Sequence, residues 1–205
     1  MADYRKLIDF LLKWEGGFVN DPADSGGATN RGVTYQTYRA LSKEVLGHSP
    51  SLERFKRLSK NEAIAIFHHF WNKATNNNSI HSQAVAEAIT SWYWGSGNYG
   101  LKNFQIMLNK RFNKHLVIDG VIGPGTTGAI NSIDEKKLFK AAIEEREIYF
   151  KRLAQRRPKD QRFLDGWLNR LSSFASRHTN LLVTGGSILG AFFLGITIYI
   201  ISKKR

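Results

Sequence analysis

Cysteine is absent from the 205-residue chain, and proline and methionine are scarce, with four and two copies. Without cysteine there is no disulfide framework and no thiolate ligand for zinc. The chain also lacks a His-Glu-x-x-His motif, and its adjacent His68 and His69 would point about 100° apart on a helix, too far to chelate one ion together. A nucleophile elbow and a phosphate-binding loop are missing as well. We therefore expect no metal site and no cofactor.

Acidic residues are also few, because 17 Asp and Glu face 30 Lys and Arg, which gives a net charge of +13. A charge of this size favours an anionic partner, and nucleic acid, a membrane surface and the acidic bacterial cell wall all qualify. It also serves solubility, and charge alone does not choose among these roles. No nucleic-acid-binding motif is recognisable, so nucleic acid is not the expected partner.

One long stretch near the C-terminus has no charge. Residues 181–201 are all uncharged, and at about 1.5 Å rise per residue they would cover the roughly 30 Å of bilayer hydrocarbon. We interpret them as a transmembrane helix between a linker at 176–180 and a basic tail at 202–205. Gly186 and Gly190 form a GxxxG pair, which is weak evidence for self-association through this helix. The N-terminus enters an amphipathic helix directly and does not read as a secretory signal peptide.

Helical patterns dominate the rest of the chain, so the expected fold class is mainly α with one small β-hairpin. The hairpin is expected within 16–33, where acid, proline and glycine residues favour turns. A glycine-broken aromatic loop is expected at 92–99 and a tight turn at 117–127. Capping signals are Thr34, Ser59 to Glu62 and Ser132 to Glu135. The helices are expected at 3–15, 34–47, 59–75, 82–92, 101–112, 135–155 and 163–174.

Glu15 stands at the end of the first helical stripe. Tyr4, Leu7, Ile8 and Leu11 recur at helical spacing, and one further step of the stripe reaches Glu15. A carboxyl group at the end of an apolar face, followed by two glycines that terminate the helix, is expected to be partly desolvated. Desolvation raises a carboxyl pKa and suits the group to general-acid catalysis. The alternative is a surface carboxylate at a helix end.

Several motifs of this chain resemble those of the glycoside hydrolase family 108 muramidases, over about residues 4–175. The resemblance implies a mainly helical, lysozyme-like fold and hydrolysis of the glycan strands of peptidoglycan. It divides the chain into a catalytic region at 1–98 and a predicted peptidoglycan-binding region at 99–175. The matching stretches are Glu15-Gly-Gly, Asp21-Pro-Ala-Asp24, Gly26-Gly-Ala-Thr29, Phe70-Trp71, Ser96-Gly97, Asp119 to Pro124 and Gly166-Trp-Leu-Asn-Arg170.

Glycoside hydrolysis needs a proton donor for the leaving oxygen and a second carboxylate. Glu15 is the candidate acid and Asp24 the candidate second carboxylate, although an Asp before Gly-Gly is equally at home as a turn residue. Whether the mechanism inverts or retains stays open. Trp71 and Trp167 are expected in the core. The candidate substrate-binding residues, each with a local structural role as the alternative, are Thr29, Arg31, Tyr93, Trp94 and Tyr99.

These observations predict an N-acetylmuramidase that cleaves the β-1,4 bond between N-acetylmuramic acid and N-acetylglucosamine, with peptidoglycan glycan strands as its partner. The predicted span would make it a single-pass protein of the bacterial membrane, with the catalytic domain on the wall-facing, periplasmic side. The alternative is a non-hydrolytic, membrane-anchored peptidoglycan-binding protein. Phage lysis, wall remodelling and wall opening for export fit the sequence equally well.

Overall fold

The computed structural model describes residues 2–13, 17–20 and 27–182 of the chain. This part consists of helices and one two-stranded antiparallel sheet, which confirms the expected mainly α class with a small hairpin. The α-helices are α1 (Arg5–Lys13), α2 (Tyr35–Leu41), α3 (Leu52–Lys56), α4 (Lys60–Thr75), α5 (Gln83–Phe112), α6 (Pro124–Asn131), α7 (Glu135–Arg156), α8 (Leu164–Ala175) and α9 (Thr179–Leu182). The remaining elements are β1 (Thr29–Asn30), β2 (Val33–Thr34), the π-helix η1 (Ser42–Leu46) and the 3-10 helices η2 (Pro158–Phe163) and η3 (Ser176–His178).

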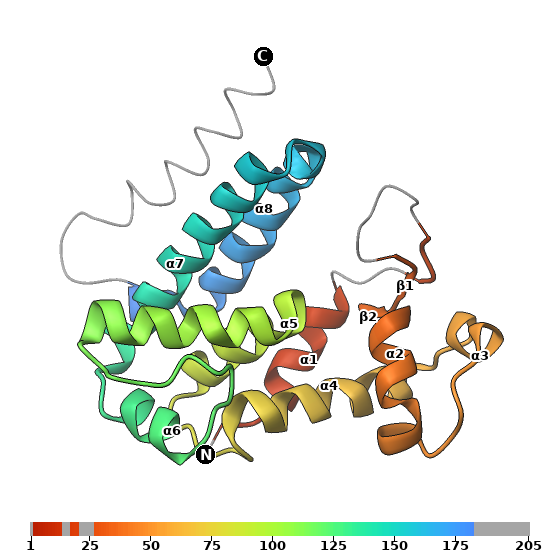
Figure 1. Ribbon diagram of the computed structural model, residues 1–205, viewed down its shortest axis with the longest axis horizontal. Helices are drawn as coiled ribbons and strands as arrows, with labels where there is room; N and C mark the ends of the chain where they lie inside the picture. Colours follow the sequence, from red (N-terminus) through yellow and green to blue (C-terminus); the bar gives the residue numbers. More distant parts are fainter. Residues whose placement is uncertain (1, 14–16, 21–26, 183–205) are drawn as a thin grey trace.

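The long helix α5 runs through the middle of the molecule. It packs against α4 on one side and against α7 on another, and α8 lies alongside α7 (Figure 1). The hairpin, α2 and α3 lie at one end of the molecule, and α6 lies at the other (Figure 1). Helices α7 and α8 therefore form a separate layer over α5.

Polar side chains begin the helices where the sequence predicts them. The Thr34 hydroxyl accepts from the Thr37 N–H at the start of α2, and Ser59 and Glu62 form a full capping box at the start of α4. These bonds satisfy backbone donors that have no partner inside the helix. Before α7, however, the capping side chain is Asp134, which accepts from the Lys137 N–H, so the predicted box from Ser132 to Glu135 is wrong.

The predicted loop at 92–99 is a kink inside α5 instead. Only Gly97 leaves the helical region, with φ +56° and ψ −151°. Glycine adopts a positive φ without the steric cost that a Cβ brings, so the helix can bend there and resume. Gly100 then lets the two halves of the kink close up, because a Cβ at this position would lie 2.6 Å from the Trp92 carbonyl oxygen.

One hydrophobic core joins residues on both sides of position 98. Its buried members include Leu7 of α1, Trp71 of α4, Phe104 of α5 and Phe139 of α7. The predicted regions 1–98 and 99–175 thus share a core, while the boundary between them stays a prediction. A second cluster under the hairpin and α2 contains Val33, Tyr38, Phe55, Leu58, Ala63 and Ile66. Trp94 of α5 packs against both clusters and so lies where the two meet.

The predicted transmembrane helix at 181–201 is corrected by the structure. No helix within 2–13, 17–20 and 27–182 is long and apolar enough to cross a membrane. The first residue of the predicted span, Leu181, ends up in α9 with its side chain buried in the main core. The predicted single-pass membrane location is contradicted with it. Gly186, Gly190 and the rest of 183–205 lie outside the described residues.

Candidate active site

Glu15 and Asp24, the two candidate carboxylates, lie outside the described residues, but the segments that flank them are placed. Helix α1 ends at Lys13, two positions before Glu15. Its Leu7 and Leu11 are buried in the main core, which confirms the apolar stripe that leads toward Glu15. The chain is described again from 17 to 20 and from residue 27 onward.

The hairpin closes the loop that contains Asp24. The backbone N–H groups and carbonyls of Val19 and Thr29 form two mutual hydrogen bonds of 2.8 Å, so the two ends of that loop are tied together. Thr29 then pairs with Thr34 in the sheet. The two turn residues, Arg31 and Gly32, both have positive φ, of +49° and +77°, as a tight type I′ hairpin turn requires.

Asn30 anchors this hairpin to the end of α3. It is only 3% exposed, and its side-chain amide donates to the carbonyl oxygens of Phe55 at 2.7 Å and Lys56 at 3.0 Å. Those carbonyls end a helix and have no partner within it. Next to it, the Arg31 Nε donates to the Leu58 carbonyl oxygen at 2.9 Å. No local sequence pattern points to this role of Asn30, since only the folded chain brings α3 to the hairpin.

Arg31 and Trp94 meet in a small apolar pocket, which we call the Arg31 pocket. The other walls come from Ile8 and Leu11 of α1 and from three side chains of α4. Trp94 is held there by edge contacts to Phe67 and Phe70, with ring centroids 5.4 and 5.1 Å apart. Two of the candidate binding residues are therefore brought together beside the helix that leads to Glu15.

The remaining candidate binding residues do not line the Arg31 pocket. The Thr29 hydroxyl donates to the nearby Gly27 carbonyl oxygen at 3.4 Å, a local contact. Tyr93 is half-buried with its ring 4.7 Å from that of Phe70, and burial raises the pKa of its phenol above the ordinary value. Tyr99 is 55% exposed and lies near Tyr149 of α7.

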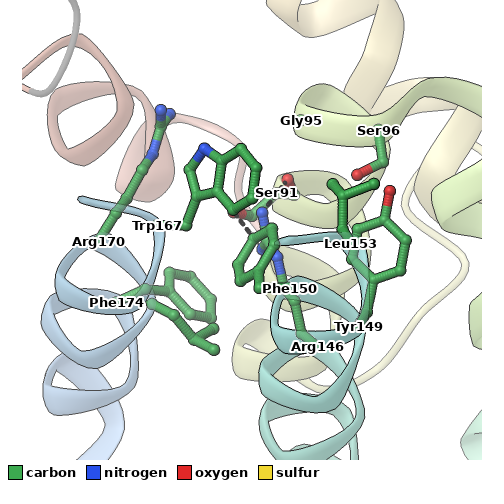
Figure 2. A pocket seen from close by; sticks show the side chains of 11 residues that line it. Ser91, Gly95, Ser96, Arg146, Tyr149, Phe150, Leu153, Trp167, Arg170 and Phe174 are labelled. Atoms are coloured by element: carbon green, nitrogen blue, oxygen red, sulfur yellow. Dashed lines mark hydrogen bonds between the residues drawn. The ribbon is translucent and has the colours of Figure 1, made fainter. Parts of the chain in front are cut away.

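A second pocket, which we call the Arg146 pocket, opens between α5, α7 and α8 with a volume of about 170 Å³ (Figure 2). Ser91 and Ser96 come from α5, Arg146 and Tyr149 from α7, and Trp167 from α8. Trp167 packs against the small core cluster of Ala154, Leu164 and Leu168, as the core prediction requires, but it is only half-buried because its other face lines this cavity. Trp71 is fully buried, as predicted.

Arg146 is the buried charge of this pocket. It is 8% exposed, and its guanidinium donates from Nη1 to the Ser91 hydroxyl at 2.8 Å and from Nη2 to the Ser91 carbonyl oxygen at 2.9 Å. Burial, together with the nearby charge of Arg170, lowers the pKa of Arg146 to about 9, which still leaves it charged at neutral pH. Sequence patterns did not single out Arg146, because its position on α7 resembles that of many exposed cations.

In the described parts of the chain, no three His, Asp or Glu side chains lie close enough to hold a metal ion. The chemistry that these parts offer is recognition by aromatic faces, guanidinium groups and hydrogen-bond donors. The two pockets lie on either side of one turn of α5, since Trp94 lines the Arg31 pocket while Gly95 and Ser96 line the Arg146 pocket.

Comparison with known proteins agrees with this architecture. Residues 8–97 match the glycosyl hydrolase 108 family, and residues 99–172 match the predicted peptidoglycan domain. The structure of SagA from Brucella abortus is similar, with a TM-score of 0.72 and 27% sequence identity over 89% of this chain and 97% of that one. No curated protein gave a significant match. The chain therefore belongs to the glycosyl hydrolase 108 family and is a glycoside hydrolase that acts on peptidoglycan.

Proposed function

We propose that the protein is an N-acetylmuramidase. It hydrolyses the β-1,4 bond between N-acetylmuramic acid and N-acetylglucosamine, and Glu15 is the general acid. The observation that carries this proposal is the placement of the Arg31 and Trp94 side chains against Ile8 and Leu11 of α1, the helix that ends two residues before Glu15. An aromatic face stacks on a sugar ring, and a guanidinium pairs with the carboxylate of a lactyl group.

In this mechanism Glu15 gives its proton to the glycosidic oxygen as the bond to the muramic acid carbon breaks. A second carboxylate then activates the water or stabilises the developing oxocarbenium ion. We propose Asp24 for that role. The hydrogen bonds between Val19 and Thr29 tie together the two ends of the loop that contains Asp24, and the Asn30 contacts fix the hairpin end of this loop to α3. Arg31 and Trp94 orient the sugar, and Thr29, Tyr93 and Tyr99 contribute further along the glycan strand.

The test is Glu15→Gln, which keeps the size of the side chain and removes its acid. We expect the release of reducing ends from purified sacculi to fall by about 10²- to 10⁴-fold, the usual contribution of a positioned acid. Glu53→Gln is the matched control, because Glu53 is an exposed side chain of α3 that pairs with Lys56, 3.1 Å away. That control should keep full activity.

Binding to sacculi separates hydrolysis from simple wall binding. Glu15→Gln should still sediment with sacculi, because the acid acts on the bond and not on wall recognition, and its urea unfolding midpoint should match that of the wild type. A glutamine variant that hydrolyses sacculi as fast as the wild type would refute the role of Glu15.

A further inference from the structure

The Arg146 pocket contains a buried cation that the fold satisfies only in part. Among the described residues, no carboxylate forms an ion pair with Arg146, and its buried Nε has no hydrogen-bond partner. Within the described chain, the guanidinium is held by the two oxygen atoms of Ser91 and by the ring of Phe150, whose centroid lies 5.4 Å from Cζ. A charge removed from water without a counter-charge is costly, so a buried cation of this kind is a candidate to pair with an anionic ligand.

The space beside this cation suits a small anionic group. Its volume of about 170 Å³ is several times the roughly 30 Å³ that one water occupies in the liquid. Figure 2 shows Arg146 and Phe150 on α7 and Trp167 and Arg170 on α8 around this space. The walls therefore combine aromatic surfaces with the guanidinium of Arg146, and guanidinium is the side-chain group whose planar fork fits a carboxylate.

A larger groove continues from this pocket along α5 and α7. The two share Ser96, Tyr149 and Leu153, and the groove has a volume of about 620 Å³. Its walls carry the cations Lys110, Arg152, Arg156 and Arg157 beside the exposed ring of Tyr99. A short extended chain with acidic groups could follow this groove and place one carboxylate at Arg146.

The position of the pocket indicates where such a chain would come from. Ser91 and Ser96 belong to the segment that matches the glycosyl hydrolase family, while Arg146 and Trp167 belong to the segment that matches the predicted peptidoglycan domain. Trp94, one turn away on α5, faces the Arg31 pocket. Peptidoglycan is a glycan from which short peptides with free carboxylates branch at each muramic acid. A glycan bound near Trp94 would therefore direct a peptide toward the other side of this turn.

We propose that the Arg146 pocket binds a free carboxylate of the peptide that branches from the peptidoglycan glycan. Only the source of this carboxylate rests on the proposed muramidase function. The guanidinium keeps its two bonds to Ser91 and uses Nε, on its other edge, to donate to the carboxylate. Trp167 and Phe150 cover the bound group and exclude water, which strengthens a charge-assisted bond.

The probe is the synthetic tetrapeptide L-Ala–γ-D-Glu–L-Lys–D-Ala, measured by titration calorimetry on the wild-type protein. It has two free carboxylates, one on the glutamate and one on the terminal alanine, and each is replaced in turn by a carboxamide. We expect one of the two amidated peptides to bind about 10- to 100-fold more weakly than the free acid, the usual worth of a hydrogen bond to a charged group. The peptide that loses affinity identifies the carboxylate.

The matched variants are Arg146→Gln and Lys151→Gln. Each removes one positive charge from α7. Lys151, however, is exposed, does not line the pocket and pairs with Glu147 at 2.6 Å. Arg146→Gln should bind the free acid and the amidated peptide equally, whereas Lys151→Gln should discriminate as the wild type does. The comparison of peptides on the wild type still decides the question if Arg146→Gln does not fold.

Equal binding of all three peptides by the wild type, or no binding of any, would overturn the proposal. Release of reducing ends from sacculi is measured on the same preparation. If the wild type hydrolyses sacculi and shows no preference among the peptides, only the carboxylate site fails. If it releases no reducing ends, the muramidase proposal fails whatever the peptides do.

Discussion

Replacing Asn30 by alanine removes the link between the hairpin and α3. The side-chain amide donates two hydrogen bonds, to the carbonyl oxygens of Phe55 and Lys56, and each is worth about 1 kcal/mol in net stability. The Phe55 oxygen keeps a bond of 3.1 Å from the Leu58 N–H, so the penalty for an unsatisfied acceptor falls mainly on Lys56. We therefore expect the free energy of unfolding to fall by about 2–3 kcal/mol.

Urea unfolding followed by tryptophan fluorescence measures this change. The control is Asn103→Ala, because the Asn103 amide donates a single exposed bond of 2.8 Å, to the Tyr99 carbonyl oxygen within α5. That control should lose less than about 1 kcal/mol. If Asn30→Ala is no less stable than Asn103→Ala, the Asn30 contacts do not hold the hairpin and the reasoning fails.

Three further substitutions test other parts of the account. Burial by itself raises the pKa of Glu87, but hydrogen bonds from His178 and Gln83 and the charge of Arg177 hold it below its ordinary value. This stabilisation is therefore complete above about pH 4.3 and is lost as the pH falls through the folded pKa. Thermal melting should depend less on acid pH in Glu87→Gln than in the wild type, and parallel curves would contradict this. Gly100→Ala should cost about 1–3 kcal/mol in urea unfolding, because its Cβ would meet backbone atoms of α5. Gly128→Ala, at an exposed position of α6, meets no atom within 4 Å and should add about 0.5–1 kcal/mol, because alanine has a higher helix propensity than glycine; a loss of stability there would refute this reasoning.

Local sequence signals predicted much of the helical framework. The caps at Thr34 and Ser59 depend on side chains three residues from the groups they bind, so the sequence contains all the information needed. The apolar stripe of α1 was equally local and was confirmed. The short helices α3 and α6 were missed, since five and eight residues are too few to show a clear period.

Long-range contacts explain the errors. Helix α5 resumes after the kink at Gly97, and α4 and α7 both pack against it, which is support that is not visible in the local sequence. An apolar residue such as Leu181 suits a membrane span and a packed core equally well, so composition could not distinguish the two environments. The role of Arg146 and Trp167 in lining a pocket was not predicted, because that pocket forms only when α7 and α8 meet.

Identification of the sugar at the new reducing end is the most direct test of the central claim. Purified sacculi are digested with the wild-type protein, the products are reduced with borohydride, and the reduced sugars are identified by mass spectrometry. The account predicts N-acetylmuramic acid at every new reducing end, in its reduced form, and about 10²- to 10⁴-fold less of it after the same digestion with Glu15→Gln. Reduced N-acetylglucosamine, or no new reducing end at all, would contradict it.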